Sequence, residues 1–449
     1  MHRARSREDR IALIGEIMRK VIVFIIGIFL ICEGLSARDK SEKMRRVSLG
    51  ATAGWAYLLG LDDYARELIH SHRTLFYTLN AAYRALPEDS SLYDNAFGYP
   101  MLEGGFLLAD YSHIRLHEEN RHAPYISGLG YMVAAYGAFR RDVVRSGRFS
   151  LSYSLENGIG LSTRPYNRVD NVDNELIGSP VSVYFGLGLQ GKYRVARHWE
   201  LYASVDLKHF SNGALDRPNK GANTVGLSAG LRYYPVPEKL TFPVRNRQGK
   251  AFDKYFYCDL SVGWAAKSLI DEWFLYYYMI SPQDPRYRTS VFPIYSALTA
   301  TVAPMFRYRL KYASGIGLDY MYMPYADRLK EVDKEKGMKG LVYSPHSVGL
   351  SLRHEVFYKR FSLYFSFGCY LFRKMGVESP DFDKGQYKYI PIEKEKPYYE
   401  TLGLRYTIPG LECVYIGYQV KAHLLKADCM ALSIGIRLEK LKKQGGRTI

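Results

Sequence analysis

A histidine and a serine lie two residues apart in the segment LKHFSNG, as His209 and Ser211. A serine hydroxyl becomes an effective nucleophile when a base within hydrogen-bond reach takes its proton, and histidine is the side chain that most often does so. In an extended strand, residues i and i+2 point to one face and lie about 6.6 Å apart along the strand. The pair therefore points to acyl transfer, provided that the segment is a strand.

The residues before this pair predict such a strand over 199–211. In WELYASVDLKHFS, one face carries apolar side chains such as Val205 and Leu207 together with His209, whereas the other carries polar ones such as Glu200 and Asp206. If the apolar face meets lipid, an ionisable group on it is costly and marks a functional site by default. We therefore expect a substrate that arrives from a bilayer.

The same alternation recurs along the chain and predicts an all-β fold, an antiparallel transmembrane β-barrel. Many of the predicted strands have ten residues or more, longer than soluble sheets usually need. A periplasmic β-sandwich, whose strands also alternate, is the alternative. The predicted strands are 76–85, 98–112, 125–140, 148–163, 181–196, 199–211, 223–234, 254–268, 292–310, 312–324, 346–358, 361–373, 398–408, 412–423 and 429–438.

The number of barrels is left open between one barrel of about 14–16 strands and two modules of about eight strands each. TVGLSAGLRYY at 224–234 and MALSIGIRL at 430–438 both resemble barrel-closing strands. The link at 235–250 carries charge and proline but no long flexible spacer, so we favour the single barrel.

We expect five regions along the chain. Arg19 and Lys20 precede an apolar run that is too short to span a membrane, which predicts a signal peptide within residues 1–37, after an over-long start. The other regions are an N-terminal lead-in at 38–75, a first β-barrel region at 76–240, a second barrel half or module at 250–440 and a basic tail at 441–449.

The net charge of +17 is spread over the chain. No basic helix interleaved with aromatic residues stands out, so we expect no nucleic-acid partner and favour anionic membrane lipid. The five cysteines include no C-x-x-C pair, and none of their spacings suggests a zinc site.

The motif HFSN at 209–212, with PNKG at 218–221 and the following strand NTVGLSAGLRYY, resembles the outer-membrane lipid A 3-O-deacylases. The resemblance is strong over residues 199–234 and looser over the strands from about residue 76 onward. It assigns residues 76–240 to a deacylase-like barrel region.

The resemblance implies a serine esterase of the Gram-negative outer membrane that acts on the 3-position acyl ester of lipid A, in lipopolysaccharide. Ser211 would be the nucleophile and His209 the base, and Asn212 and the backbone N–H groups of Gly213 and Ala214 would bind the oxyanion. No metal or organic cofactor is implied.

One position departs from this family. Asn223 stands where the family has a glutamate that orients the histidine, and an amide cannot stabilise an imidazolium as a carboxylate does. Asp216, in the turn after Ser211, is the alternative acid, whereas Asp206 points to the opposite face.

Other readings of the chain compete with the enzyme. A non-catalytic outer-membrane barrel, porin-like or structural, or a lipid-binding β protein could carry the same motif. His423 and Asp428 weakly echo it, but the parity of His423 predicts a lumen-facing side chain. The sequence around His113 and His117 predicts a polar strand end and a loop rather than a metal site. Two histidines at this spacing would need a helix to bind one metal ion, and the alternation does not support a helix there.

Overall fold

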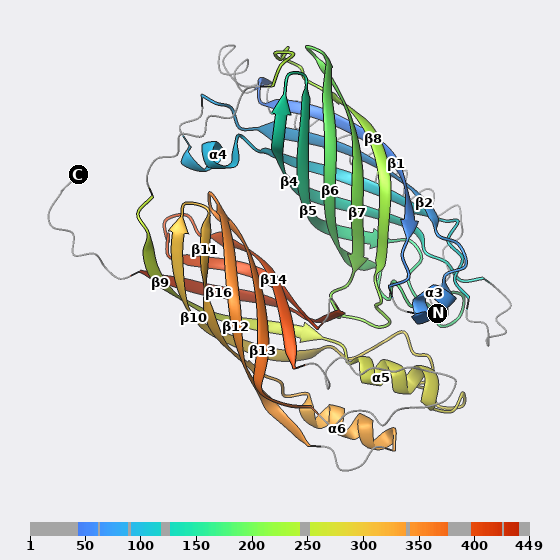
Figure 1. Cartoon of the computed structure of the whole chain (residues 1–449). Coiled ribbons are helices and arrows are strands. Elements are labelled where there is room, and N and C mark those ends of the chain that lie inside the picture. Colours follow the sequence, from blue (N-terminus) through green and yellow to red (C-terminus); the bar gives the residue numbers. More distant parts are fainter. Residues whose placement is uncertain are drawn as a thin grey trace. The chain divides into compact units, whose positions relative to one another are not determined.

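The computed structural model describes residues 44–61, 63–88, 91–117, 126–242, 252–337, 342–375, 397–423 and 426–439. In these residues the strands form two closed barrels, each with its strands in chain order (Figure 1). The predicted all-β fold is confirmed, and of the two arrangements left open the structure has the two eight-stranded modules. Our preference for a single barrel is therefore wrong. The predicted signal peptide at 1–37 and basic tail at 441–449 lie outside the described residues.

The first barrel closes before the chain reaches the proline-containing link. Strand β8 pairs antiparallel with β1, from Leu49 opposite Tyr233 to Leu58 opposite Thr224. Two short helices, α3 (Asp63–Leu68) and α4 (Leu92–Phe97), lie in its connections. Its strands are β1 (Val47–Leu58), β2 (Arg73–Arg84), β3 (Met101–Tyr111), β4 (Gly130–Ser146), β5 (Phe149–Ser162), β6 (Val181–Ala196), β7 (Trp199–Ser211) and β8 (Ala222–Tyr233).

Strand β1 was missed from the sequence, and it lies in the stretch 38–75 that we expected to be a lead-in. The first barrel thus begins at Val47 rather than at residue 76. Its sequence, VSLGATAGWAYL, places small residues where an apolar alternation would show. Gly54 is small for a physical reason, since a Cβ there would lie 2.5 Å from Phe76 Cζ and 2.6 Å from the Leu227 carbonyl oxygen.

The second barrel closes in the same way, because β16 pairs antiparallel with β9. A short helix, α5 (Ile270–Phe274), and a π-helical turn, η2 (Leu275–Met279), follow β9, and α6 (Ala326–Glu335) follows β11. No helix in the described part of the chain is long and apolar enough to cross a membrane. The strands are β9 (Tyr255–Lys267), β10 (Tyr295–Arg309), β11 (Tyr312–Tyr322), β12 (Tyr343–Tyr358), β13 (Phe361–Met375), β14 (Tyr398–Thr407), β15 (Val414–His423) and β16 (Lys426–Glu439).

Each barrel is filled by paired charges. In the first, Glu103 accepts hydrogen bonds from Arg140 Nε at 2.8 Å and Arg232 Nη2 at 2.7 Å. In the second, Glu355 lies 3.4 Å from Arg405 and 2.8 Å from Arg437. Buried charges are tolerated when they are paired in this way, because their mutual attraction offsets the loss of hydration. Removing one partner would leave an uncompensated buried charge.

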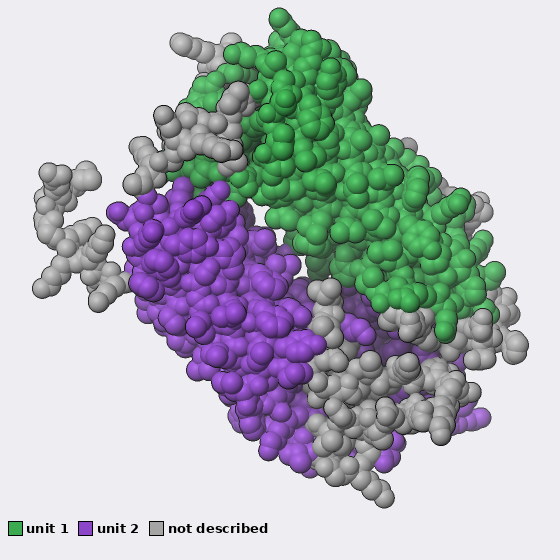
Figure 2. Space-filling model, viewed as in Figure 1, with its two compact units in different colours: residues 1–165, 180–210, 221–247 green, residues 166–179, 211–220, 248–449 purple. Residues whose placement is uncertain are grey.

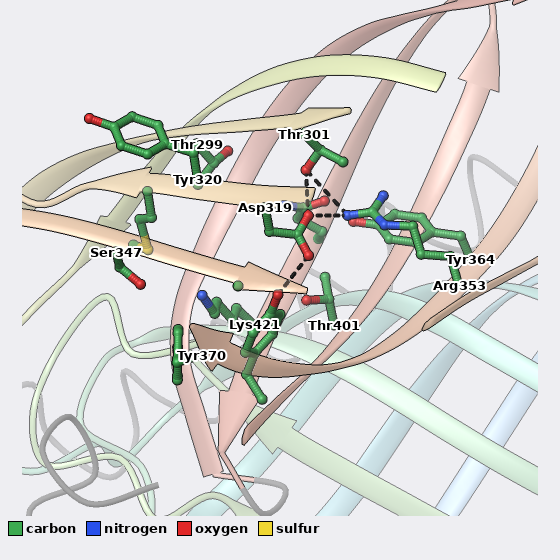
Figure 3. A pocket seen from close by; sticks show the side chains of 14 residues that line it. Thr299, Thr301, Asp319, Tyr320, Ser347, Arg353, Tyr364, Tyr370, Thr401 and Lys421 are labelled. Atoms are coloured by element: carbon green, nitrogen blue, oxygen red, sulfur yellow. Dashed lines mark hydrogen bonds and ion pairs between the residues drawn. The ribbon is translucent and has the colours of Figure 1, made fainter. Parts of the chain in front are cut away.

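Little free space remains among these side chains. A cavity of about 30 Å³ in the second barrel is lined by residues that include Lys421 and the bonded pair Asp319 and Arg353, which lie 2.5 Å apart (Figure 3). A cavity in the first barrel measures about 20 Å³. Such volumes hold a water molecule or two, as expected of eight-stranded barrels whose interiors are filled by side chains. The described lumens therefore offer no porin-like channel, and chemistry is to be sought outside them.

The chain divides into two compact units (Figure 2). Residues 1–165, 180–210 and 221–247 form unit 1, and residues 166–179, 211–220 and 248–449 form unit 2. Unit 2 thus contains the second barrel together with two connecting segments, one between β5 and β6 and one between β7 and β8.

Candidate active site

Strand β7 has the two faces that its sequence predicts. Leu201, Val205 and Leu207 are 45–49% exposed on the outer face, whereas Glu200 and Lys208 are buried on the inner one. Odd-numbered residues therefore face outward along the strand, and His209 shares their parity. His209 therefore lies on the outer face, as the alternation of the sequence predicts.

His209 is held by Asn223 of the neighbouring strand. The two residues lie directly opposite each other in the β7–β8 ladder, and His209 Nδ1 lies 2.7 Å from Asn223 Oδ1. Asn223 Nδ2 donates a hydrogen bond to the Gly221 carbonyl oxygen at 3.2 Å, which turns the amide oxygen toward the imidazole. The proton of a neutral imidazole then lies on Nδ1, and Nε2 is the nitrogen that can accept a proton.

Gly221 leaves room for this imidazole. Its φ is +77°, a left-handed conformation that favours glycine, and a Cβ there would lie 2.8 Å from His209 Cε1. Any larger residue would push against the ring. The sequence motif contains this glycine, but the pattern alone did not reveal that its contact is with the histidine.

Ser211 is the last residue of β7, two positions beyond His209, and its side chain is largely buried. A tight turn follows, in which the Leu215 N–H donates to the Asn212 carbonyl oxygen at 3.2 Å. Its two central residues, Gly213 and Ala214, have φ values of +62° and +72°, the signature of a type I′ turn. Among the described residues, neither of their N–H groups has a hydrogen-bond acceptor, and both residues are buried.

The Asn212 side chain is engaged in holding this segment. Its Nδ2 group donates to Ser179 Oγ at 3.2 Å and to the Asp216 carbonyl oxygen at 3.1 Å, and its backbone N–H donates to Asn219 Oδ1 at 3.1 Å. The donors that we expected Asn212 to offer an oxyanion therefore bind Ser179, Asp216 and Asn219. That leaves the central N–H groups of the turn as the better candidates.

Asp216 lies in the same segment but interacts elsewhere. Its Oδ1 accepts a hydrogen bond from the Arg217 N–H at 2.8 Å. Burial raises the pKa of the Asp216 carboxyl to about 6, although the Arg217 N–H and guanidinium act in the opposite direction. Because Asn223 occupies His209 Nδ1, the described contacts favour Asn223 over Asp216 as the group that orients the histidine.

The remaining sequence candidates lie where their patterns predict. His423 is buried inside the second barrel, with Nε2 2.8 Å from the Tyr370 hydroxyl. His113 and His117 lie in the connection after β3. Asp206 faces the interior, where it accepts hydrogen bonds from Ser204 and Ser228. No group of acidic, histidine and cysteine side chains in the described residues has the arrangement of a metal site.

Two closed, eight-stranded antiparallel barrels place the chain among the outer-membrane β-barrel proteins. Two family models match the chain: "Lipid A 3-O-deacylase (PagL)" over residues 90–232, and "Acyloxyacyl hydrolase, C-terminal domain" over residues 259–440. The chain belongs to this PagL-like family of lipid A deacylases. The first match covers most of the first barrel and all of the predicted catalytic residues, and the second covers nearly all of the second barrel.

Weak similarities to solved structures were also found. The outer membrane enzyme PagL is 17% identical, over 41% of this chain and 97% of that one, with a TM-score of 0.25. OccK11 (OpdR) of Pseudomonas aeruginosa is 10% identical, over 88% and 96%, with a TM-score of 0.16. CdiB from Acinetobacter baumannii is 11% identical, over 87% and 60%, with a TM-score of 0.16. The comparison with curated proteins found no match.

Proposed function

We propose that this protein is a serine esterase that hydrolyses the 3-position acyl ester of lipid A at the outer face of its first barrel. The observation that carries the proposal is the 2.7 Å contact between His209 Nδ1 and Asn223 Oδ1 on the lipid-facing side of β7 and β8. An ionisable side chain on that face is costly unless it has a task. An acyl chain already embedded in the bilayer would bring its ester to this face.

In the proposed reaction, Ser211 Oγ attacks the ester carbonyl carbon while His209 Nε2 takes the hydroxyl proton. The tetrahedral intermediate then breaks its bond to the sugar oxygen, which receives that proton from His209. A water molecule, deprotonated by His209, then attacks the carbonyl carbon of the acyl-serine. The second tetrahedral intermediate breaks its bond to Ser211 Oγ, which takes the proton back from His209, and the fatty acid leaves. The enzyme thereby returns to its starting state.

The oxyanion of each tetrahedral intermediate would be bound by the N–H groups of Gly213 and Ala214. Both belong to the turn that directly follows Ser211, and both lack an acceptor among the described residues. Donors that are fixed before the reaction stabilise developing charge without reorganisation, and each contributes roughly 100- to 1000-fold to the rate. The Asn212 side chain contributes by bracing this segment.

Asn223 would do part of the work of the family's glutamate. Replacing a triad carboxylate by an amide costs about 10⁴-fold when it leaves the histidine in the wrong tautomer. Here the bond from Asn223 Nδ2 to the Gly221 carbonyl turns the amide oxygen toward Nδ1, which favours the productive tautomer. What the amide cannot supply is charge to stabilise the imidazolium, so we expect a functional but slower enzyme.

The test is mass spectrometry of lipid A from cells that produce the wild-type protein, Ser211→Ala or His209→Ala. We expect loss of one 3-hydroxyacyl chain with the wild type alone. Ser204→Ala, on the inner face of the same strand, is the matched control and should keep the activity. Heat-modifiable migration on a gel verifies that each variant forms its barrels. Identical lipid A profiles for the wild type and both site variants would refute the esterase and favour a non-catalytic barrel.

A further inference from the structure

The turn that carries the proposed oxyanion donors is anchored, inside unit 2, on the residue that follows β9. The Ala214 carbonyl oxygen accepts two hydrogen bonds from Ser268, one from its backbone N–H at 2.7 Å and one from its Oγ at 3.0 Å. Both residues are completely buried. A carbonyl held by two donors from one residue has little freedom to rotate.

Arg217 adds a second pair of hydrogen bonds between this segment and Ser268. Its Nε and Nη2 atoms donate to the Ser268 carbonyl oxygen at 3.3 and 3.0 Å. Ser268 therefore donates to the segment at Ala214 and accepts from it at Arg217, three residues further on. The planar guanidinium fork fixes direction as well as distance, which a lysine could not do.

Met430 of β16 supports the other side of the turn. A Cβ added to Gly213 would lie 2.0 Å from Met430 Sδ, so the Gly213 backbone lies directly against this side chain. The residues that bracket the turn, Ser268 and Met430, both come from the second half of the chain. The second barrel thus provides the surface on which the turn is shaped.

The turn requires such support because its backbone is strained. Ala214 has a φ of +72°, a conformation that residues with a Cβ adopt rarely and retain when the surroundings enforce it. Without the hydrogen bonds to Ser268, the peptide units around Gly213 and Ala214 would be free to rotate their N–H groups away from the position of the oxyanion. Oxyanion stabilisation depends on donors fixed in advance.

We propose that Ser268 is a positioning residue for catalysis: it locks the Asn212–Leu215 turn so that the Gly213 and Ala214 N–H groups are held as oxyanion donors. Within unit 2, Ser268 and Met430 then hold the turn that follows β7. This inference rests on the proposed esterase activity and extends it, because it assigns a catalytic purpose to residues outside the motif.

The experiment compares Ser268→Ala with the wild type in the full-length protein, reconstituted with lipid A. The variant keeps the backbone donor and loses the Oγ donor, so we expect kcat to fall about 10-fold with KM little changed. Affinity for a phosphonate transition-state analogue should fall by a similar factor. A residue with a merely structural role would lower the yield of folded protein but would not separate kcat from KM.

Ser351→Ala is the matched control, because Ser351 is also buried in the second barrel and donates to a backbone carbonyl, that of Gly317, at 3.4 Å. It should keep the wild-type kcat. Met430→Ala and Met430→Leu form a second pair that does not depend on Ser268. The alanine, which leaves space beneath Gly213, should lower kcat, and the bulkier leucine should restore most of it.

The outcomes separate the two proposals. If the wild type is active, Ser211→Ala is inactive and Ser268→Ala keeps the wild-type kcat, the positioning role is wrong while the esterase stands. Equal losses in Ser268→Ala and Ser351→Ala would also overturn it, because a general effect on the barrel would then explain both. An inactive wild-type protein would overturn the esterase and this inference together.

Discussion

Two histidines lie near strand ends but on opposite faces of their barrels: His209 on the outer face of β7 and His423 on the inner face of β15. His209 faces outward and contacts the Asn223 amide oxygen. His423 faces the lumen, 3.9 Å from the Asp428 carboxylate and 2.8 Å from the Tyr370 hydroxyl. By its partner alone, the second would be the better catalytic histidine.

The location of each histidine, rather than its partner, decides what it can do. Asp428 also contacts Lys267, and Arg373 Nη1 lies 3.0 Å from His423 Nε2, so this histidine belongs to a closed network of buried charges. A lipid ester cannot enter such a packed lumen. His209 has a weaker partner but lies on the outer face of its barrel, where the proposed lipid substrate could reach it.

The largest effect should come from removing each histidine in turn. His209→Ala should lower lipid A deacylation by at least about 1000-fold, because it removes the base on which the serine depends. His423→Ala should keep the activity and lose stability, by about 1–3 kcal/mol, since it leaves buried partners unsatisfied. Deacylation rates and thermal unfolding of the two purified variants check this. Loss of activity in folded His423→Ala would show that the lumen histidine takes part in the reaction.

Changing Asn223 tests how much its amide contributes. Asn223→Ala removes the oxygen that orients Nδ1, and we expect a fall of about 100-fold, within the range of a lost general-base contribution. Asn223→Glu supplies the carboxylate of the family and should raise the rate a few-fold by stabilising the imidazolium. Single-turnover rates on lipid A measure both. A fall in Asn223→Glu would mean that the site is built around the amide, with Gly221 as its required partner.

Substituting Gly221 probes the position of the ring itself. Gly221→Ala places a Cβ 2.8 Å from His209 Cε1, so the imidazole must move and the rate should fall about 10-fold. Gly410→Ala is the control, because Gly410 has a similar φ of +81° but open space around its Cα. Both variants carry the backbone strain, and only one carries the collision. Equal rates in the two variants would remove Gly221 from the site.

The sequence predicted much of the fold and the face of β7 on which His209 lies, for reasons that the same residues explain. Alternation survives in strands whose outer faces carry large apolar side chains, such as Leu207 on β7, so parity placed His209 correctly. Strand β1 was missed because close packing at Gly54 requires small residues, which weaken the pattern. Barrel number depends on whether β8 returns to β1, which is a pairing between segments far apart in the chain.

The support behind the motif could not be predicted at all. Nothing in the sequence connects Ser268 with Ala214, because hydrogen bonds between a carbonyl and a backbone N–H leave no signature in residue types. The bond between Asn223 and Gly221 is similar: it determines which way the amide points, and a backbone carbonyl makes it. The side-chain types could be read from the sequence, whereas their arrangement depends largely on hydrogen bonds to main-chain atoms.

The smallest effect on activity should come from Asp216, which separates the two candidate partners of His209. Asp216→Asn should keep at least half of the wild-type rate, because Asn223 orients the histidine. Stability should respond to pH instead. The folded-state pKa of Asp216, about 6, lies above its ordinary value of 3.8, so its carboxyl favours unfolding once it ionises. The wild type should therefore lose stability relative to Asp216→Asn as the pH rises from about 4 to 6, with the difference constant above that range and absent below it. Thermal unfolding of both proteins at pH 4 and pH 8 measures this difference. A large loss of activity in folded Asp216→Asn would mean that Asp216, rather than Asn223, is the group that supports His209.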